Sequence, residues 1–258
     1  MTTVTDLHPG ALASIPAAGR RRAMPMPAQL AFFYGPMDCG KSTLALQIDH
    51  NQTRQGRRGM VLTRYDRSGR PQVTTRVGLS HAALEVEDDT DLRAVVREEW
   101  AEGRPVDYLV VDEAGFLTRE HVDQLAELVD DWHVDVWCFG LATDFRSVLL
   151  PGAARLVELA DVLSPVQVEV LCWCGRPGRL NARLVDGVMV REGDTVVVAD
   201  TAPHGTQGAA PGSDAGRDVE PAVRYQVLCR AHHRRGELGP SRPEAEQPQL
   251  DFGQLDPS

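Results

Sequence analysis

The stretch L-A-F-F-Y-G-P-M-D-C-G-K-S-T, residues 30–43, decides the fold of this 258-residue chain. Its first five residues are apolar and predict a buried strand, and the next eight fit the pattern G-x-x-x-x-G-K-[ST]. In that pattern successive backbone N–H groups converge on phosphate oxygens, and the following helix adds the positive end of its dipole. We therefore predict a nucleoside triphosphate site, with an ordinary glycine turn before a helix as the alternative. The predicted phosphate-binding residues are Gly35, Pro36, Met37, Asp38, Cys39, Gly40, Lys41, Ser42 and Thr43.

Three side chains of this loop have separate expected roles. Lys41 is expected to reach the β- and γ-phosphates, and the Ser42 hydroxyl is expected to ligate Mg²⁺. We interpret Cys39 as a small residue that fits the loop. The alternative is an oxidation-sensitive thiol whose pKa is lowered by the helix N-terminus.

A second apolar strand ends in two carboxylates. Residues 108–111 read Y-L-V-V and run directly into Asp112 and Glu113. At the carboxyl end of a parallel strand, both side chains would face the ligand crevice beside the phosphate loop. Asp112 is then the expected Mg²⁺ partner, and Glu113 is free to take a proton from an attacking hydroxyl. The alternative is a surface Asp-Glu pair that opens a loop.

Charge and hydropathy exclude several classes of protein. The formal net charge is −10, which argues against a general nucleic-acid binder because such proteins need a basic face. No apolar run approaches the ~20 residues that span a bilayer, so we expect no membrane partner. With no export signal recognised at the N-terminus, we expect a cytoplasmic protein.

The pattern of the chain predicts an α/β fold with a RecA-like core, a parallel sheet and a smaller β-rich unit. The core is expected at residues 29–163 and the small unit at 164–238, which contains a long loop at 201–221. Residues 1–28 and 239–258 are expected to be disordered tails. The predicted core strands are 30–34, 60–62, 108–111 and 134–139, and those of the small unit are 166–171, 188–190, 196–198 and 223–228. The predicted helical faces contain Leu92, Val95, Val96 and Trp100; Val122, Leu125, Ala126 and Val129; and Leu156, Leu159, Ala160 and Leu163.

Cysteines flank the strands of the small unit. Cys172 and Cys174 form one potential chelating pair, and Cys229 and His232 form another. Four N and S ligands satisfy a tetrahedral structural Zn²⁺, and a unit this small needs such a stabilising ion. His233 is an alternative fourth ligand, and two unrelated buried cysteines are the alternative to a metal site.

Together these motifs resemble the cellular-type (class II) thymidine kinases over roughly residues 29–235. The resemblance is carried by the phosphate loop after F-F-Y, by V-D-E-A at 111–114 with Phe116, by C-F-G-L at 138–141 running into T-D-F-R at 143–146, and by the Cys/His clusters. It implies an ATP-dependent kinase that phosphorylates the 5′-hydroxyl of thymidine to give dTMP. It also implies a catalytic Mg²⁺, a structural Zn²⁺ and a homotetramer.

The resemblance also assigns individual roles. Glu113 would be the general base, Phe145 would pack on the thymine ring, and Tyr225 would line the pocket. Residues 190–225 would form a lasso over thymidine, and Arg183 would lie near the phosphates or the catalytic carboxylate. Asp66 and Arg67 would lie on a flexible loop near the triphosphate and the subunit contacts.

Two departures from the family pattern keep an impaired homologue open, and the phosphate loop with a strand-terminal Asp-Glu also fits another class of protein. Gly115 replaces the usual Gln, and the lasso carries about twenty extra residues, an insertion that loop-closure entropy tolerates. One alternative is a catalytically impaired nucleotide-binding homologue. The other is a RecA-like P-loop ATPase that acts on nucleic acid, which the acidic net charge disfavours.

Overall fold

A computed structural model describes residues 27–64, 72–74, 80–195 and 223–239. Several predictions concern residues outside these ranges and are not followed further. They are the two tails apart from residues 27, 28 and 239, the loop at 201–221, the strand at 196–198, and Asp66 and Arg67.

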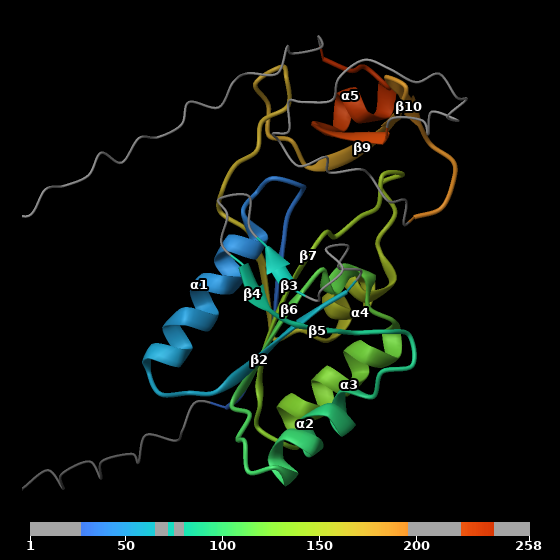
Figure 1. Ribbon diagram of the computed structural model, residues 1–258. Helices are drawn as coiled ribbons and strands as arrows, with labels where there is room; N and C mark the ends of the chain where they lie inside the picture. Colours follow the sequence, from blue (N-terminus) through green and yellow to red (C-terminus); the bar gives the residue numbers. More distant parts are fainter. Residues whose placement is uncertain (1–26, 65–71, 75–79, 196–222, 240–258) are drawn as a thin grey trace, which may run out of the picture.

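A six-stranded sheet in which every neighbouring pair is parallel forms the centre of the molecule (Figure 1). This arrangement confirms the predicted α/β core with a parallel sheet. The strand order is β5 (Leu84–Glu85), β2 (Gly59–Thr63), β6 (Tyr108–Asp112), β7 (Asp135–Gly140), β1 (Leu30–Tyr34) and β8 (Val162–Pro165). A short hairpin of β3 (Gln72–Thr74) and β4 (Ser80–Ala82) lies outside this sheet.

Helices cover both faces of the sheet, which explains the continuous apolar run of β6. Tyr108 and Val110 pack with Ala45 of α1 (Lys41–Arg54) on one face. Leu109 and Val111 pack on the other face, in the core that also contains the buried residues of the remaining helices. Those helices are α2 (Leu92–Ala101), α3 (Arg119–Asp130) and α4 (Pro151–Leu159). Figure 1 shows α1 on one side of the sheet and α2, α3 and α4 on the other.

The last predicted helical face of the core is wrong at its C-terminal end. Helix α4 ends at Leu159, Ala160 is extended, and Leu163 lies in β8. The Asp161 carboxylate accepts a hydrogen bond from the backbone N–H of Leu30 at 2.8 Å, which supports the turn into this strand. Because β8 is an edge strand, Leu163 is 45% exposed, and the sequence shows no continuous apolar run there.

A second, antiparallel sheet has the order β10 (Val188–Val190), β9 (Leu180–Val185) and β11 (Val223–Leu228), and α5 (Arg230–Arg235) follows it. The predicted strand at 166–171 is wrong. This segment makes only an isolated bridge, between Leu171 and Pro177. Its first N–H, of Val166, donates to the Tyr34 carbonyl, and the Val170 carbonyl accepts from the N–H of Gly178. Figure 1 shows the small sheet and α5 beyond the end of the main sheet where α1 begins. Among the described residues, no helix has both the length and the apolar character to cross a membrane.

Candidate active site

The phosphate loop connects β1 to α1, as the sequence predicts. Gly40 is the N-cap of α1 and has φ +80°, a left-handed conformation that favours glycine. Gly35 is required for a different reason, since a Cβ there would come within 2.5 Å of the Cys39 sulfur. The Lys41 ammonium donates to the Pro36 carbonyl at 2.8 Å, so the buried side chain folds over the loop. A cation is thus held where the phosphates are expected.

Cys39 is fully buried inside the loop. Burial raises the pKa of its thiol, and the opposing effect of Lys41 is smaller. This direction is opposite to that of the activated thiol, and it supports the interpretation of Cys39 as a small residue that fills space.

The acidic strand end is bonded directly to the loop. The Ser42 hydroxyl donates to Asp112 Oδ2 at 2.7 Å, and the backbone N–H of Glu113 donates to Asp112 Oδ1 at 3.0 Å. Asp112 is 5% exposed, and this burial raises its pKa. A carboxylate and a hydroxyl are the oxygen ligands that Mg²⁺ prefers, so the pair fits this ion.

Glu113 has a left-handed backbone, with φ +54° and ψ +30°. Such a conformation is uncommon for a residue other than glycine, and strained residues of this kind concentrate at functional sites. Glu113 follows the carboxyl end of β6 and precedes the short 3-10 helix η1 (Ala114–Phe116). The sharp turn places it beside Asp112 at the sheet edge where the phosphate loop also lies.

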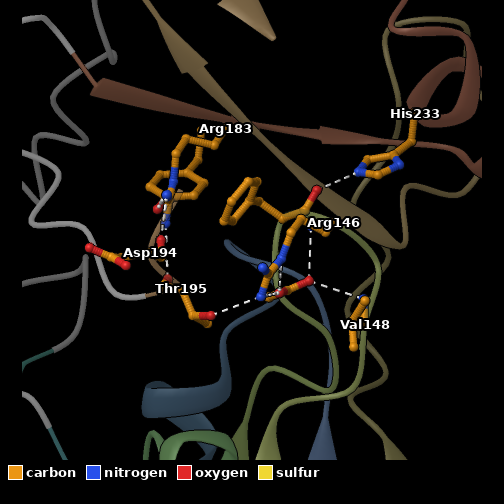
Figure 2. A network of polar contacts seen from close by, with 9 residues as sticks. Arg146, Val148, Arg183, Asp194, Thr195 and His233 are labelled. Atoms are coloured by element: carbon orange, nitrogen blue, oxygen red, sulfur yellow. Dashed lines mark hydrogen bonds and ion pairs between the residues drawn. The ribbon is translucent and has the colours of Figure 1, made fainter. Parts of the chain in front are cut away.

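The three predicted substrate residues come together from separate elements. The Arg183 guanidinium lies 3.8 Å from the centre of the Phe145 ring, and its Nε donates to the Tyr225 hydroxyl at 2.9 Å. Its terminal nitrogens donate to the carbonyls of Asp194 at 2.6 Å and Thr195 at 2.9 Å (Figure 2). The structure therefore places Arg183 on the Phe145 ring, and its role near the phosphates stays a prediction.

A tight turn after β7 presents Phe145. Asp144 Oδ1 accepts from the backbone N–H groups of Arg146 at 2.9 Å and Val148 at 3.0 Å. The Arg146 side chain donates to Asp144 and also to the Thr195 hydroxyl at 3.0 Å (Figure 2). Sequence reasoning assigned no role to Asp144, although an aspartate side chain often accepts from the backbone two residues on in a turn.

The four predicted metal ligands also meet. Their ligand atoms all lie within 4.8 Å of one another, with Cys172 Sγ 3.3 Å from His232 Nδ1 and Cys174 Sγ 4.0 Å from Cys229 Sγ. A tetrahedral Zn²⁺ with bonds of roughly 2.0–2.3 Å needs ligand separations of about 3.5–3.8 Å, so the cluster fits the ion. Trp173 stacks on the imidazole of His232 with ring centres 4.3 Å apart.

Two residues link the two sheets, and the sequence did not predict this role for either of them. Asn181 of β9 is buried, and its side-chain oxygen accepts from the backbone N–H of Met37 in the phosphate loop at 2.9 Å. His233 is not in the metal cluster, because its ring faces the Phe145 carbonyl. No local motif marks Asn181, whereas His233 was considered only as a ligand.

A parallel sheet, a phosphate loop ahead of α1 and an acidic strand end bonded to the loop serine define a P-loop nucleotide-binding protein. The adjoining group of Phe145, Arg183 and Tyr225 and the Cys/His cluster distinguish it from a bare nucleotide-binding core.

Comparison with known proteins identifies the family. A family model described as thymidine kinase matches residues 28–202. The thymidine kinase of Streptomyces coelicolor is 51% identical over 207 residues, which cover 80% of this chain and 89% of that protein. That of Cutibacterium acnes is 48% identical over 212 residues, with coverages of 82% and 91%. The thymidine kinase of Salmonella typhimurium is 40% identical over 210 residues, with coverages of 80% and 91%. The chain belongs to the thymidine kinase family, which confirms the resemblance seen in its motifs.

Proposed function

We propose that this chain transfers the γ-phosphoryl group of ATP to the 5′-hydroxyl of thymidine, giving dTMP for nucleotide salvage. Membership of the thymidine kinase family supports this activity. The observation that carries the proposal is the Ser42–Asp112 hydrogen bond, because it joins the phosphate loop to the strand end that bears Glu113. A triphosphate, its metal ion and a proton acceptor would then share one sheet edge.

The residues of the site have two kinds of role in the reaction, which are positioning of the substrates and proton transfer. Lys41 and the loop N–H groups bind and orient the phosphates. Ser42 and Asp112 would hold Mg²⁺, which neutralises charge on the β- and γ-phosphates when bound. The Glu113 carboxylate takes the proton of the 5′-hydroxyl as that oxygen attacks the γ-phosphorus, and ADP leaves.

The small sheet and the turn after β7 together would supply the nucleoside side of the site. Phe145 would pack on thymine and Tyr225 would line the pocket, as the family resemblance implies, and Arg183 contacts both side chains. Cys172, Cys174, Cys229 and His232 would hold a structural Zn²⁺, since all four tetrahedral positions are taken by protein. We further propose a cytoplasmic homotetramer on the family resemblance, and light scattering of the purified protein tests the oligomeric state.

A phosphoryl-acceptor screen tests the reaction. Purified protein, ATP and Mg²⁺ are incubated with each nucleoside in turn, and ADP release is measured. Release that depends on thymidine is expected. Release stimulated only by DNA would favour a RecA-like ATPase, and nucleotide binding without turnover would favour an impaired homologue.

Replacement of the base tests the assignment of Glu113. We expect Glu113→Gln to lower kcat by about 10²–10⁴, the usual contribution of a general base, while ATP binding is retained. Lys41→Ala is the matched comparison, because it should weaken ATP binding and turnover together. Steady-state kinetics and calorimetric ATP titration separate the two variants. Full activity of Glu113→Gln would show that the base lies elsewhere.

A further inference from the structure

His233 lies on α5 directly after the metal-cluster residue His232, but it faces the opposite direction. Its ring is buried, with 2% of the residue exposed, and its Nε2 lies 2.9 Å from the carbonyl oxygen of Phe145 (Figure 2). The contact joins two residues that are 88 positions apart in the chain. His233 therefore connects the helix that carries a metal ligand to the residue expected to contact the base.

The two ring nitrogens of His233 bind the same turn. A carbonyl oxygen can only accept, so Nε2 carries the proton and donates to Phe145. The unprotonated Nδ1 then accepts from the Ser147 hydroxyl at 3.4 Å. Ser147 has φ +65°, an uncommon conformation for serine that the surrounding contacts must maintain. A two-point contact restrains both the position of Phe145 and the shape of its turn.

Helix α5 is itself held on both sides. His232 belongs to the metal cluster, and the Arg191 guanidinium donates to the carbonyls of His233 and, at 3.0 Å, Arg234. A six-residue helix has little stability of its own, so these contacts fix where the His233 ring sits. The restraint on Phe145 thus originates in the cluster and in Arg191, which directly follows β10.

We propose that His233 is a positioning residue for thymidine binding, which couples the Cys/His cluster to the placement of Phe145. The proposal rests on the proposed function, in which Phe145 packs on thymine. The ring of His233 bonds to Phe145 and Ser147, so it acts through the turn that presents Phe145. Its loss should impair thymidine binding and leave the phosphate loop intact.

Two substitutions separate the hydrogen bond from the volume of the ring. His233→Phe keeps a ring but removes the donor, and we expect the KM for thymidine to rise roughly tenfold with kcat and the KM for ATP nearly unchanged. His233→Gln places an amide N–H near the position of Nε2, so it should restore most of the thymidine affinity. Arg234→Gln is the control, since Arg234 is an exposed neighbour on the same helix. Zinc content and thermal stability are measured for every variant.

Hydrogen exchange gives a readout that does not depend on thymidine. Backbone amides of residues 144–148 should exchange faster in His233→Phe than in the wild type or His233→Gln. An unchanged KM for thymidine in His233→Phe, with zinc retained, would overturn the proposal. Loss of zinc in both His233→Phe and His233→Gln would also overturn the proposal, because His233 would then be a general structural support. Failure of the proposed function is distinct, since the wild type itself would show no thymidine-dependent ADP release.

Discussion

Gly115 lies two residues after the proposed base, in the buried helix η1. A Cβ atom at this position would come within 2.4 Å of the Leu141 carbonyl oxygen and 3.0 Å of Leu150 Cδ1. Close packing in this chain therefore leaves no room for a side chain at this position, where the family pattern usually has Gln. Space around η1, and not a missing polar contact alone, accounts for the glycine.

Gly115→Ala should test this packing. The added methyl group meets a backbone oxygen that cannot move aside cheaply, so we expect a loss of about 1–3 kcal/mol in the free energy of unfolding. Because η1 directly follows Glu113, kcat should fall as well. Urea denaturation followed by circular dichroism measures the first effect, and initial rates measure the second. An unfolding midpoint equal to that of the wild type would show that η1 has room for a side chain.

Local patterns made part of the site predictable at the residue scale. The residues of the phosphate loop are contiguous in sequence, so the motif itself indicated Lys41 and Ser42. Asp112 ends an apolar run, and the rule that parallel strands end at one edge indicated it as their neighbour. The left-handed turn at Glu113 and the stacking of Arg183 on Phe145 left no such signal. They depend on contacts between distant segments, which residue types alone do not specify.

At the scale of elements, burial on both faces decided which strands could be predicted from the sequence. Strands β1 and β6 are covered by helices on both sides, and their apolar runs predicted them closely. Strand β8 is an edge strand with an exposed leucine, so helical periodicity continued into it from α4. Strand β9 was missed because polar Asn181 and Arg183 point into contacts with other segments and interrupt its apolar pattern.

Strand β9 also reaches the phosphate loop, and Asn181→Ala tests that link. The substitution removes the acceptor for the Met37 N–H, so the loop loses one of its restraints. We expect the KM for ATP to rise several-fold, in line with the loss of one buried hydrogen bond. Arg224→Ala on the adjacent strand is the control, since that residue is exposed. Equal ATP kinetics in the two variants would mean that β9 does not restrain the loop.

At the scale of the whole molecule, two sheets contribute residues to the proposed site. The parallel sheet carries the phosphate loop and both carboxylates, and the antiparallel sheet carries Arg183 and Tyr225. The described contacts that join them include Asn181 to Met37 and His233 to Phe145. The buried core of the antiparallel sheet is small, and two of its four fully buried members are the cysteines Cys172 and Cys229.

A core of this size should depend on the metal, because so little apolar surface is buried without it. We therefore expect chelation of zinc, or Cys229→Ser, to loosen the antiparallel sheet and abolish thymidine-dependent turnover. ATP binding should persist at reduced affinity, since the phosphate loop belongs to the other sheet. Metal analysis, limited proteolysis and calorimetric titration with ATP and thymidine measure these effects. Zinc added back to the chelated wild type should restore activity where Mg²⁺ alone does not, and a folded, active preparation without zinc would contradict the prediction.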